Sequence, residues 1–246
     1  MKNEMKLDEL KKEVIVRVPV VRDGNVVYSL KSRRGPSKWR NLRNADYGKN
    51  PENDTPFRQL SFPENERLAF WAFSNDTELA TKPVIQAVNS YWLTGNSLVV
   101  YTPKDFIGVD FPEESIVAQL GNDSKENITR IAESLKARLG KREDNDVVFS
   151  DDGRVRWTKR EGIFTQDLSS KSALATYRGN IVLSGSLENA DLTSKLADKY
   201  SANPKFWASD AKYAVRVPGL GAGGGRLHVS AGGFGNDGSW YSFGGQ

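Results

Sequence analysis

The reactive side chains of this sequence exclude several kinds of chemistry. His228 is the single histidine among 246 residues, and there is no cysteine. A thiol nucleophile and a redox dithiol are therefore excluded, and so is a zinc site, because zinc takes three or four ligands drawn mostly from cysteine and histidine. No G-x-S-x-G motif accompanies His228, so we expect a histidine that contacts its own sheet rather than a catalytic triad. We expect no cofactor and no metal.

Six basic side chains and no acidic one lie between residues 31 and 43. Lysine and arginine attract phosphates, and the indole of Trp39 in their midst can stack on a base. The alternative is a solvated hairpin end whose arginines pair with acids elsewhere in the fold. The candidate nucleic-acid-binding residues of this first cluster are Lys31, Arg33, Arg34, Lys38, Trp39, Arg40 and Arg43.

A second basic cluster spans residues 154–160. If this stretch is a strand, Arg154 and Arg156 share one face, and Trp157 lies on the other. Such a ribbon can follow a phosphate backbone; the alternative places Trp157 in the core and the arginines in water. The candidate binding residues of this second cluster are Arg154, Arg156, Lys159 and Arg160.

Acidic side chains offer a rival chemistry. Converging carboxylates could hold Mg²⁺ for phosphodiester cleavage, and two carboxylates beside sugar-stacking aromatics could cleave a glycosidic bond. However, residues 151–153 also suit a tight turn, and no strand carries the second motif of a nuclease. The carboxylates considered are Asp144, Asp146, Asp151 and Asp152, and, near an aromatic helix, Glu64, Glu66 and Asp76. No spacing singles out a catalytic set, so the catalytic residues stay unassigned.

The elements that must position these residues are hairpins and amphipathic helices. Turn residues predict a hairpin around 23–25 and a second one joining 147–149 to 154–158. Apolar spacing predicts helices within 64–95, at 124–139 and at 187–200, with a short one at 204–209. We expect strands at 97–102, 163–165, 173–177, 181–184 and 212–217. The residues predicted to be buried on helix faces are Val88, Trp92, Ile128, Ile131 and Leu135.

These elements indicate an α+β fold with a mixed or mostly antiparallel sheet, β-hairpins, several amphipathic helices and a Gly-rich C-terminal segment. We expect a globular region over 1–217, with an internal boundary near 141–146 in a charged linker. Residues 218–246 hold eleven glycines. Few of their side chains can offset the entropy of ordering, so we expect this segment to need a partner. Residues 219–225 resemble a phosphate loop, but no helix or Lys-Ser/Thr follows.

Charge and hydropathy bound the function. The net charge is +4 and the isoelectric point about 9.1. No apolar run is long enough to cross a membrane, and residues 1–12 lack the apolar stretch of a signal peptide. We therefore expect a cytoplasmic or virion protein. The leading hypothesis is a non-catalytic structural or assembly protein, a homo-oligomer or part of a larger particle, whose basic surfaces face nucleic acid or neighbouring subunits. The rival is a carboxylate-dependent hydrolase, either a metal-dependent nuclease or a cell-wall glycosidase.

Overall fold

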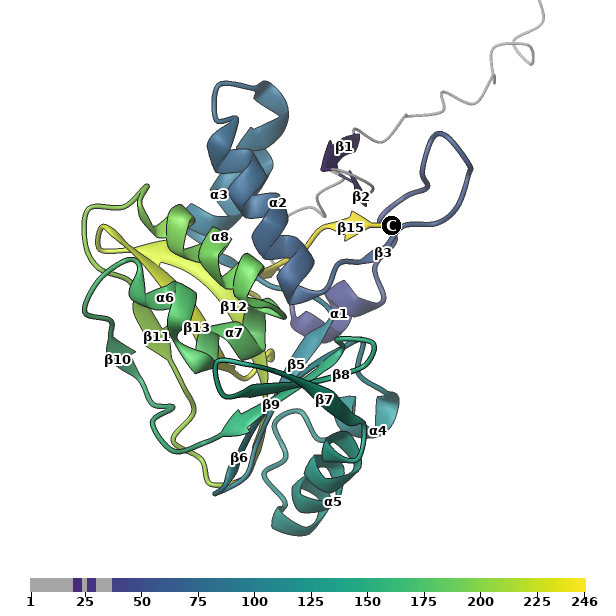
Figure 1. Cartoon of the computed structure of the whole chain (residues 1–246). Helices are drawn as coiled ribbons and strands as arrows, with labels where there is room; N and C mark the ends of the chain where they lie inside the picture. The colour runs from purple at the N-terminus through teal and green to yellow at the C-terminus, as the bar shows by residue number, and fades with distance from the viewer. Residues whose placement is uncertain (1–19, 24–25, 30–36) are drawn as a thin grey trace, which may run out of the picture.

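An 11-stranded sheet dominates the computed structural model, which describes residues 20–23, 26–29 and 37–246 (Figure 1). Its strands run in the order β10-β11-β13-β12-β5-β6-β9-β8-β7, with β4 and β14 beside β12. The pairs β11–β13 and β14–β4 are parallel, and the other pairs are antiparallel. The strands are β4 (Trp92–Leu93), β5 (Ser97–Tyr101), β6 (Asp105–Asp110), β7 (Leu139–Asp144), β8 (Val147–Ser150), β9 (Val155–Lys159), β10 (Gln166–Asp167), β11 (Lys205–Trp207), β12 (Ala214–Gly223), β13 (Arg226–Gly233) and β14 (Trp240–Tyr241). The predicted α+β fold with a mixed, mostly antiparallel sheet is confirmed.

Helices cover both faces of this sheet. They are α1 (Trp39–Arg43), α2 (Phe62–Ser74), the 3₁₀ turn η2 (Leu79–Thr81), α3 (Lys82–Ser90), α4 (Glu114–Val117), α5 (Lys125–Lys136), α6 (Ala173–Thr176), α7 (Arg178–Ser184) and α8 (Leu187–Ala197). In Figure 1, α4 and α5 lie at the bottom of the view, and α2, α3 and α8 lie above. Alternate residues of β5 show the two layers. Val99 and Tyr101 join the core under α2, α3, α7 and α8, whereas Leu98 and Val100 join the core under α1, α4 and α5.

The helix patterns seen in the sequence correspond to buried faces. Ile128, Ile131 and Leu135 of α5 are buried, as predicted, and so is Val88 of α3. Trp92 is partly exposed on β4. α2 begins with a capping box, in which Ser61 accepts from the Glu64 amide and the Glu64 carboxylate accepts from the Ser61 amide. These caps satisfy amide groups that a helix N-terminus leaves without intrahelical partners.

The C-terminal segment belongs to the fold, contrary to the sequence-based expectation. The boundary drawn at 217/218 cuts through β12, and Leu227, Val229 and Phe243 are fully buried. The last strand, β15 (Gly244–Gly245), lies between β2 (Val26–Ser29) and β3 (Arg58–Gln59) in a second sheet that β1 (Val20–Asp23) completes. The residues beyond 217 are therefore ordered by strands of their own chain.

Close packing explains part of this glycine content. A Cβ atom at Gly219 would lie 2.8 Å from the Trp240 ring, and one at Gly233 would lie 2.3 Å from it. Both positions therefore exclude any larger residue, and the indole occupies the space that their missing side chains leave. The aromatic and glycine residues of the segment form one packing arrangement, and composition alone suggested flexibility instead.

Several predicted elements are correct and others are wrong. The hairpins β1–β2 and β8–β9 are present. The supposed linker 141–146 is part of strand β7, paired with β8, so it marks no domain boundary. Segments 173–177 and 181–184 form helices, because an apolar run suits a helix buried on all sides as well as a strand. Segment 204–209 contains strand β11 instead of a helix.

Candidate nucleic-acid interface

The first basic cluster is divided by the structure. Lys31, Arg33 and Arg34 lie outside the described residues. Trp39, at the start of α1, is fully buried, and its Nε1 donates to the Gly95 carbonyl oxygen at 2.8 Å. Its indole presents no face to a ligand, so the stacking role predicted for Trp39 does not fit this fold.

The remaining cations of α1 attach this helix to the segment that follows β6. Arg40 is exposed and donates to the Val117 carbonyl oxygen at 2.8 Å. Arg43 forms an ion pair with Glu114 and donates to the Pro112 carbonyl oxygen at 2.9 Å. Lys38, which precedes the helix, is exposed. The basic face of α1 therefore lies along residues 112–117.

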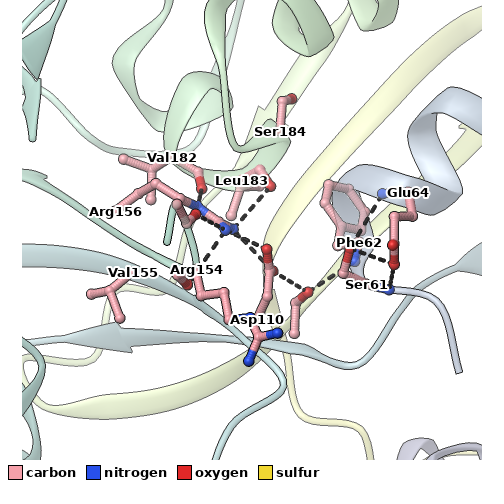
Figure 2. Close-up of polar contacts among 12 residues, drawn as sticks. Ser61, Phe62, Glu64, Asp110, Arg154, Val155, Arg156, Val182, Leu183 and Ser184 are labelled. Carbon is pink, nitrogen blue, oxygen red and sulfur yellow. Dashed lines mark hydrogen bonds and ion pairs between the residues drawn. The ribbon is translucent and has the colours of Figure 1, made fainter. Parts of the chain in front are cut away.

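Within the second cluster, Arg156 is an interior residue. It is 1% exposed, forms an ion pair with Asp110, and donates from Nε to the Val182 carbonyl oxygen at 2.9 Å (Figure 2). The hydroxyl of Ser97 donates to the same Asp110 carboxylate at 2.6 Å. Because Val182 lies in the last turn of α7, Arg156 ties that helix end to β6 and β9. Burial removes Arg156 from any surface, which corrects its assignment as a nucleic-acid contact.

Arg154, which directly precedes β9, is exposed to solvent. In Figure 2 its guanidinium lies outside the network of dashed lines around Arg156. Its Cζ lies 5.5 Å from the centre of the Phe111 ring, and the Cζ of Arg58 lies 4.4 Å from that centre. Arg58 also forms an ion pair with Glu64 at 2.5 Å. One partly exposed ring therefore orders two guanidinium groups, both from exposed residues.

The two basic clusters, which are far apart in the sequence, thus contact two consecutive residues, Phe111 and Pro112. Arg154 lies over Phe111, and Arg43 hydrogen-bonds the next residue, Pro112. We call this region the Phe111 surface. Its members are Arg40, Arg43, Arg58, Phe111 and Arg154.

The acids near the Phe111 surface neutralise part of it. Glu114 pairs with Arg43, and Glu64 pairs with Arg58. The other two cations, Arg40 and Arg154, form no ion pair with any acid in the described part of the chain.

Lys159 and Arg160 lie at the opposite end of β9 and do not join this surface. Arg160 donates to three backbone carbonyl oxygens, those of Thr102, Ser209 and Lys212, so its guanidinium is used within the fold. Lys159 lines a shallow cleft with Lys104 and Lys136. Two acids, Asp105 and Glu161, line the same cleft. The three lysines and the two acids nearly balance in charge, so this cleft is not a basic surface.

Asp105 is built into that cleft. Its carboxylate accepts hydrogen bonds from Thr102, Trp157 and Lys136, at 2.6, 2.8 and 3.1 Å. Burial opposes ionisation of this carboxyl, but the hydrogen bonds and the Lys136 charge outweigh it and lower the pKa of Asp105. Trp157 is half-buried beside it, whereas the expected alternative had placed this ring in the core.

The acidic candidates are dispersed. Asp151 and Asp152 occupy the β8–β9 turn, where Asp152 accepts from the Ser150 hydroxyl and the Arg154 amide. Asp144 pairs with Arg142, and Asp146 follows in the turn before β8. Asp76 is exposed beyond the end of α2. Within 20–23, 26–29 and 37–246, no group of three His, Asp or Glu side chains is arranged to hold a metal ion.

Glu66 is the most perturbed of these carboxyl groups. It is 2% exposed and accepts hydrogen bonds at Oε1 from the hydroxyls of Ser184 (3.1 Å) and Thr193 (2.9 Å). Burial raises the pKa of Glu66 to about 8, and the two hydroxyls and the Arg156 charge offset this only in part. Its contacts lie between α2, α7 and α8, so it acts as a buried polar link between helices.

His228 and the glycine-rich loop also have structural places. His228 lies on β13, where its Nδ1 accepts from the Trp207 Nε1 at 3.1 Å and its Nε2 lies 3.2 Å from the Gly223 carbonyl oxygen. Residues 219–225 complete β12 and turn into β13, with positive φ angles at Gly224 and Gly225. No helix follows this turn, in agreement with the rejection of a phosphate loop.

Sequence reasoning missed Arg58 and Phe111. Arg58 stands alone in an irregular stretch, and Phe111 follows a strand that was not predicted, so neither carried a local signal. It also missed a groove lined by four aromatic residues from three distant segments: they are Trp92, Trp207, Phe234 and Trp240. The number of tryptophans was visible, but their convergence depends on the pairing of β4, β11, β13 and β14.

Comparisons with known proteins identify no relative: no family model matches the chain, and neither a curated protein nor a solved structure shows significant similarity to it. Among the described helices, none has both the length and the apolar character that a membrane crossing requires.

Proposed function

We propose that this chain is a non-catalytic assembly protein that contacts nucleic acid through the Phe111 surface. The observation that supports this is the meeting of the two basic clusters, with Arg154 over Phe111 and Arg43 bound to Pro112. A guanidinium over a ring keeps N–H donors free for other partners, and its planar fork of donors suits phosphate oxygens. Arg40 extends the same surface along α1 to Val117.

The hydrolase alternative receives no such support. A glycosidase needs two carboxylates facing each other across a substrate, and a metal-dependent nuclease needs them around an ion. Glu64 caps α2, Glu66 is buried between helices, and Asp152 organises a turn. Each of these carboxylates has a structural use, and no two of them meet in a cleft.

The nucleic-acid part of the proposal is tested by removing two cations that have no acidic partner. We expect Arg40→Ala combined with Arg154→Ala to weaken retention of a single-stranded 20-nucleotide oligonucleotide at low salt by about tenfold or more, since several phosphate contacts act together. The matched control is Lys82→Ala combined with Lys199→Ala, which removes the same charge from two exposed sites elsewhere. Equal loss in both double variants would mean that net charge, and not this surface, retains the oligonucleotide.

The assembly part concerns the native mass. We place the chain in a homo-oligomer or a larger particle, such as a virion or a cytoplasmic complex, and expect the purified protein to have a native mass of several 27.3-kDa subunits. Analytical ultracentrifugation with and without the oligonucleotide measures this, and a monomer under both conditions contradicts it.

A further inference from the structure

The aromatic groove is a second candidate site, lined by residues that are not members of the Phe111 surface. It has a volume of about 300 Å³ and is lined by Trp92, Trp207, Phe234 and Trp240. Trp207 and Phe234 are 38% and 57% exposed, and they lie together on one concave surface, as the apolar residues of interaction sites do. Concave sites of this volume with aromatic walls and a few polar groups are typical of small-molecule recognition.

Polar groups lie at the edge of this groove. Asp237 and Ser230 line it, together with the backbone of Gly232 and Gly233. Oδ1 of Asp237 accepts from the amide and hydroxyl of Ser239, which orients the carboxylate, and no described residue donates to Oδ2. The groove therefore offers a hydrogen-bond acceptor beside flat apolar walls.

The wall that Trp207 forms is fixed in place. Its Nε1 donates to Nδ1 of His228, which requires that this ring nitrogen carry no proton. The other ring nitrogen, Nε2, then donates to the Gly223 carbonyl oxygen. Trp92 also contacts this imidazole, with ring centres 6.3 Å apart. A single neutral histidine thus holds two indoles of the groove in a defined arrangement.

The charges around the groove select among ligands. The Nζ of Lys205 lies 4.2 Å from the Trp207 ring centre, and the Cζ of Arg216 lies 4.4 Å from the Phe234 ring centre. Two of the four rings are therefore already engaged by cations, which disfavours a quaternary ammonium ligand. The Asp237 carboxylate in turn disfavours a phosphate. An uncharged ligand with one apolar face and polar edges meets neither penalty.

We propose that this groove binds a neutral saccharide. The C–H face of a pyranose ring is apolar and packs on an indole, while its equatorial hydroxyls project from the ring edge toward groups such as Asp237 and Ser230. Glycoside hydrolysis requires two carboxylates, and among the described residues Asp237 is the one carboxylate that lines this groove. The site therefore binds the sugar without cleaving it. This inference does not depend on nucleic-acid binding at the Phe111 surface.

The test uses the full chain and four uncharged probes: cellohexaose, maltohexaose, xylohexaose and N-acetylchitohexaose. Isothermal titration and tryptophan fluorescence should show that at least one of them binds. Phe234→Ala should weaken that binding about tenfold. Phe164→Ala, which removes a ring of similar exposure (55%) from another surface, should leave it unchanged. The melting temperature of each variant shows whether it folds, and Trp207→Phe gives a second wall variant if one fails.

Two results would overturn the proposal. One is the failure of all four saccharides to bind at millimolar concentration. The other is binding of choline or oligo(dT) that Phe234→Ala abolishes, because the groove would then select a cation or a nucleobase. Oligonucleotide retention that depends on Arg40 and Arg154 should be the same in Phe234→Ala and in the parent, which separates the outcome at this groove from that at the Phe111 surface.

Discussion

At the scale of single residues, the buried ion pair between Arg156 and Asp110 organises the region behind the Phe111 surface. The two side chains are 1% and 9% exposed, and Asp110 is the residue directly before Phe111. Removing one partner of a buried pair leaves an uncompensated charge in the interior. The position of Phe111 therefore depends on a contact that no nucleic acid would touch.

We expect Asp110→Ala to lower the free energy of unfolding by about 3–5 kcal/mol, because the Arg156 guanidinium would lose its counter-charge. Urea denaturation measures this. The control is Asp144→Ala, which breaks the ion pair between Asp144 and Arg142. Both of these side chains are more exposed than Asp110 and Arg156, so this change should lower the free energy of unfolding by less than about 1 kcal/mol. Similar losses in both variants would show that the Arg156 pair contributes no more than a surface pair.

Glu66 makes stability depend on pH in a direction that can be derived. Its pKa is about 8 in the folded chain and near 4.5 when unfolded, so the folded state keeps a proton that the unfolded chain releases. The stabilisation is complete below pH 4.5 and is lost as the pH rises toward 8. Glu66→Gln removes this titration while keeping a neutral hydrogen-bonding group.

As the pH rises from 5 to 8, we therefore expect the free energy of unfolding of Glu66→Gln to increase relative to that of the parent. The increase should be up to about 1.4 kcal/mol per pH unit. Urea midpoints across this range measure the difference. Glu133→Gln, at an exposed position of α5, should run parallel to the parent. A constant offset between Glu66→Gln and the parent would mean that Glu66 is ionised throughout.

At the scale of elements, the C-terminal strands take part in both sheets. β12 and β13 lie in the middle of the large sheet, and β15 joins the N-terminal hairpin to β3. Two phenylalanines of this segment differ sharply in exposure: Phe243 is fully buried, and Phe234 is 57% exposed. They provide a matched pair of sites for substitution.

Phe243→Ala should cost about 3–5 kcal/mol of unfolding free energy, since it removes buried apolar area and leaves a cavity. Phe234→Ala should change stability by less than about 0.5 kcal/mol. Thermal or chemical denaturation compares the two. If Phe243→Ala were as stable as the parent, the C-terminal segment would not be part of the core.

How far the sequence predicts these elements depends on whether their signal is local. Turn residues located both hairpins, and the spacing of Ile128, Ile131 and Leu135 located α5. The run Ile181–Leu183 has no polar positions to reveal a period, so a buried helix was mistaken for a strand. β6 begins and ends with aspartate, and its apolar centre is short, so it was missed.

The same reason limits prediction of the Phe111 surface. Apart from Arg58, its cations belong to the two basic clusters of the sequence, but burial divides each cluster. Arg154 is exposed and Arg156 is interior, although both were placed on one face of a strand. Helix α7 covers β9 and takes up Arg156, a tertiary contact that the strand pattern cannot contain.

At the scale of the whole molecule, the two candidate sites draw on different sets of strands. The Phe111 surface forms where β3, β6, β9 and α1 approach one another, and the groove forms where β4, β11, β13 and β14 meet. The net charge of +4 is too small to make the entire surface attract nucleic acid. Binding must therefore come from local clustering, and the central claim concerns where the cations gather.

The salt dependence of oligonucleotide binding tests this claim most directly. Each phosphate contact to a single strand adds about 0.7 to the slope of log Kobs against log salt concentration. If Arg40 and Arg154 each contact one phosphate, their combined alanine variant should lose about 1.4 from the parent's slope. The Lys82→Ala, Lys199→Ala variant should keep the parent's slope. Equal slopes in the parent and the Arg40→Ala, Arg154→Ala variant would contradict a nucleic-acid interface at the Phe111 surface.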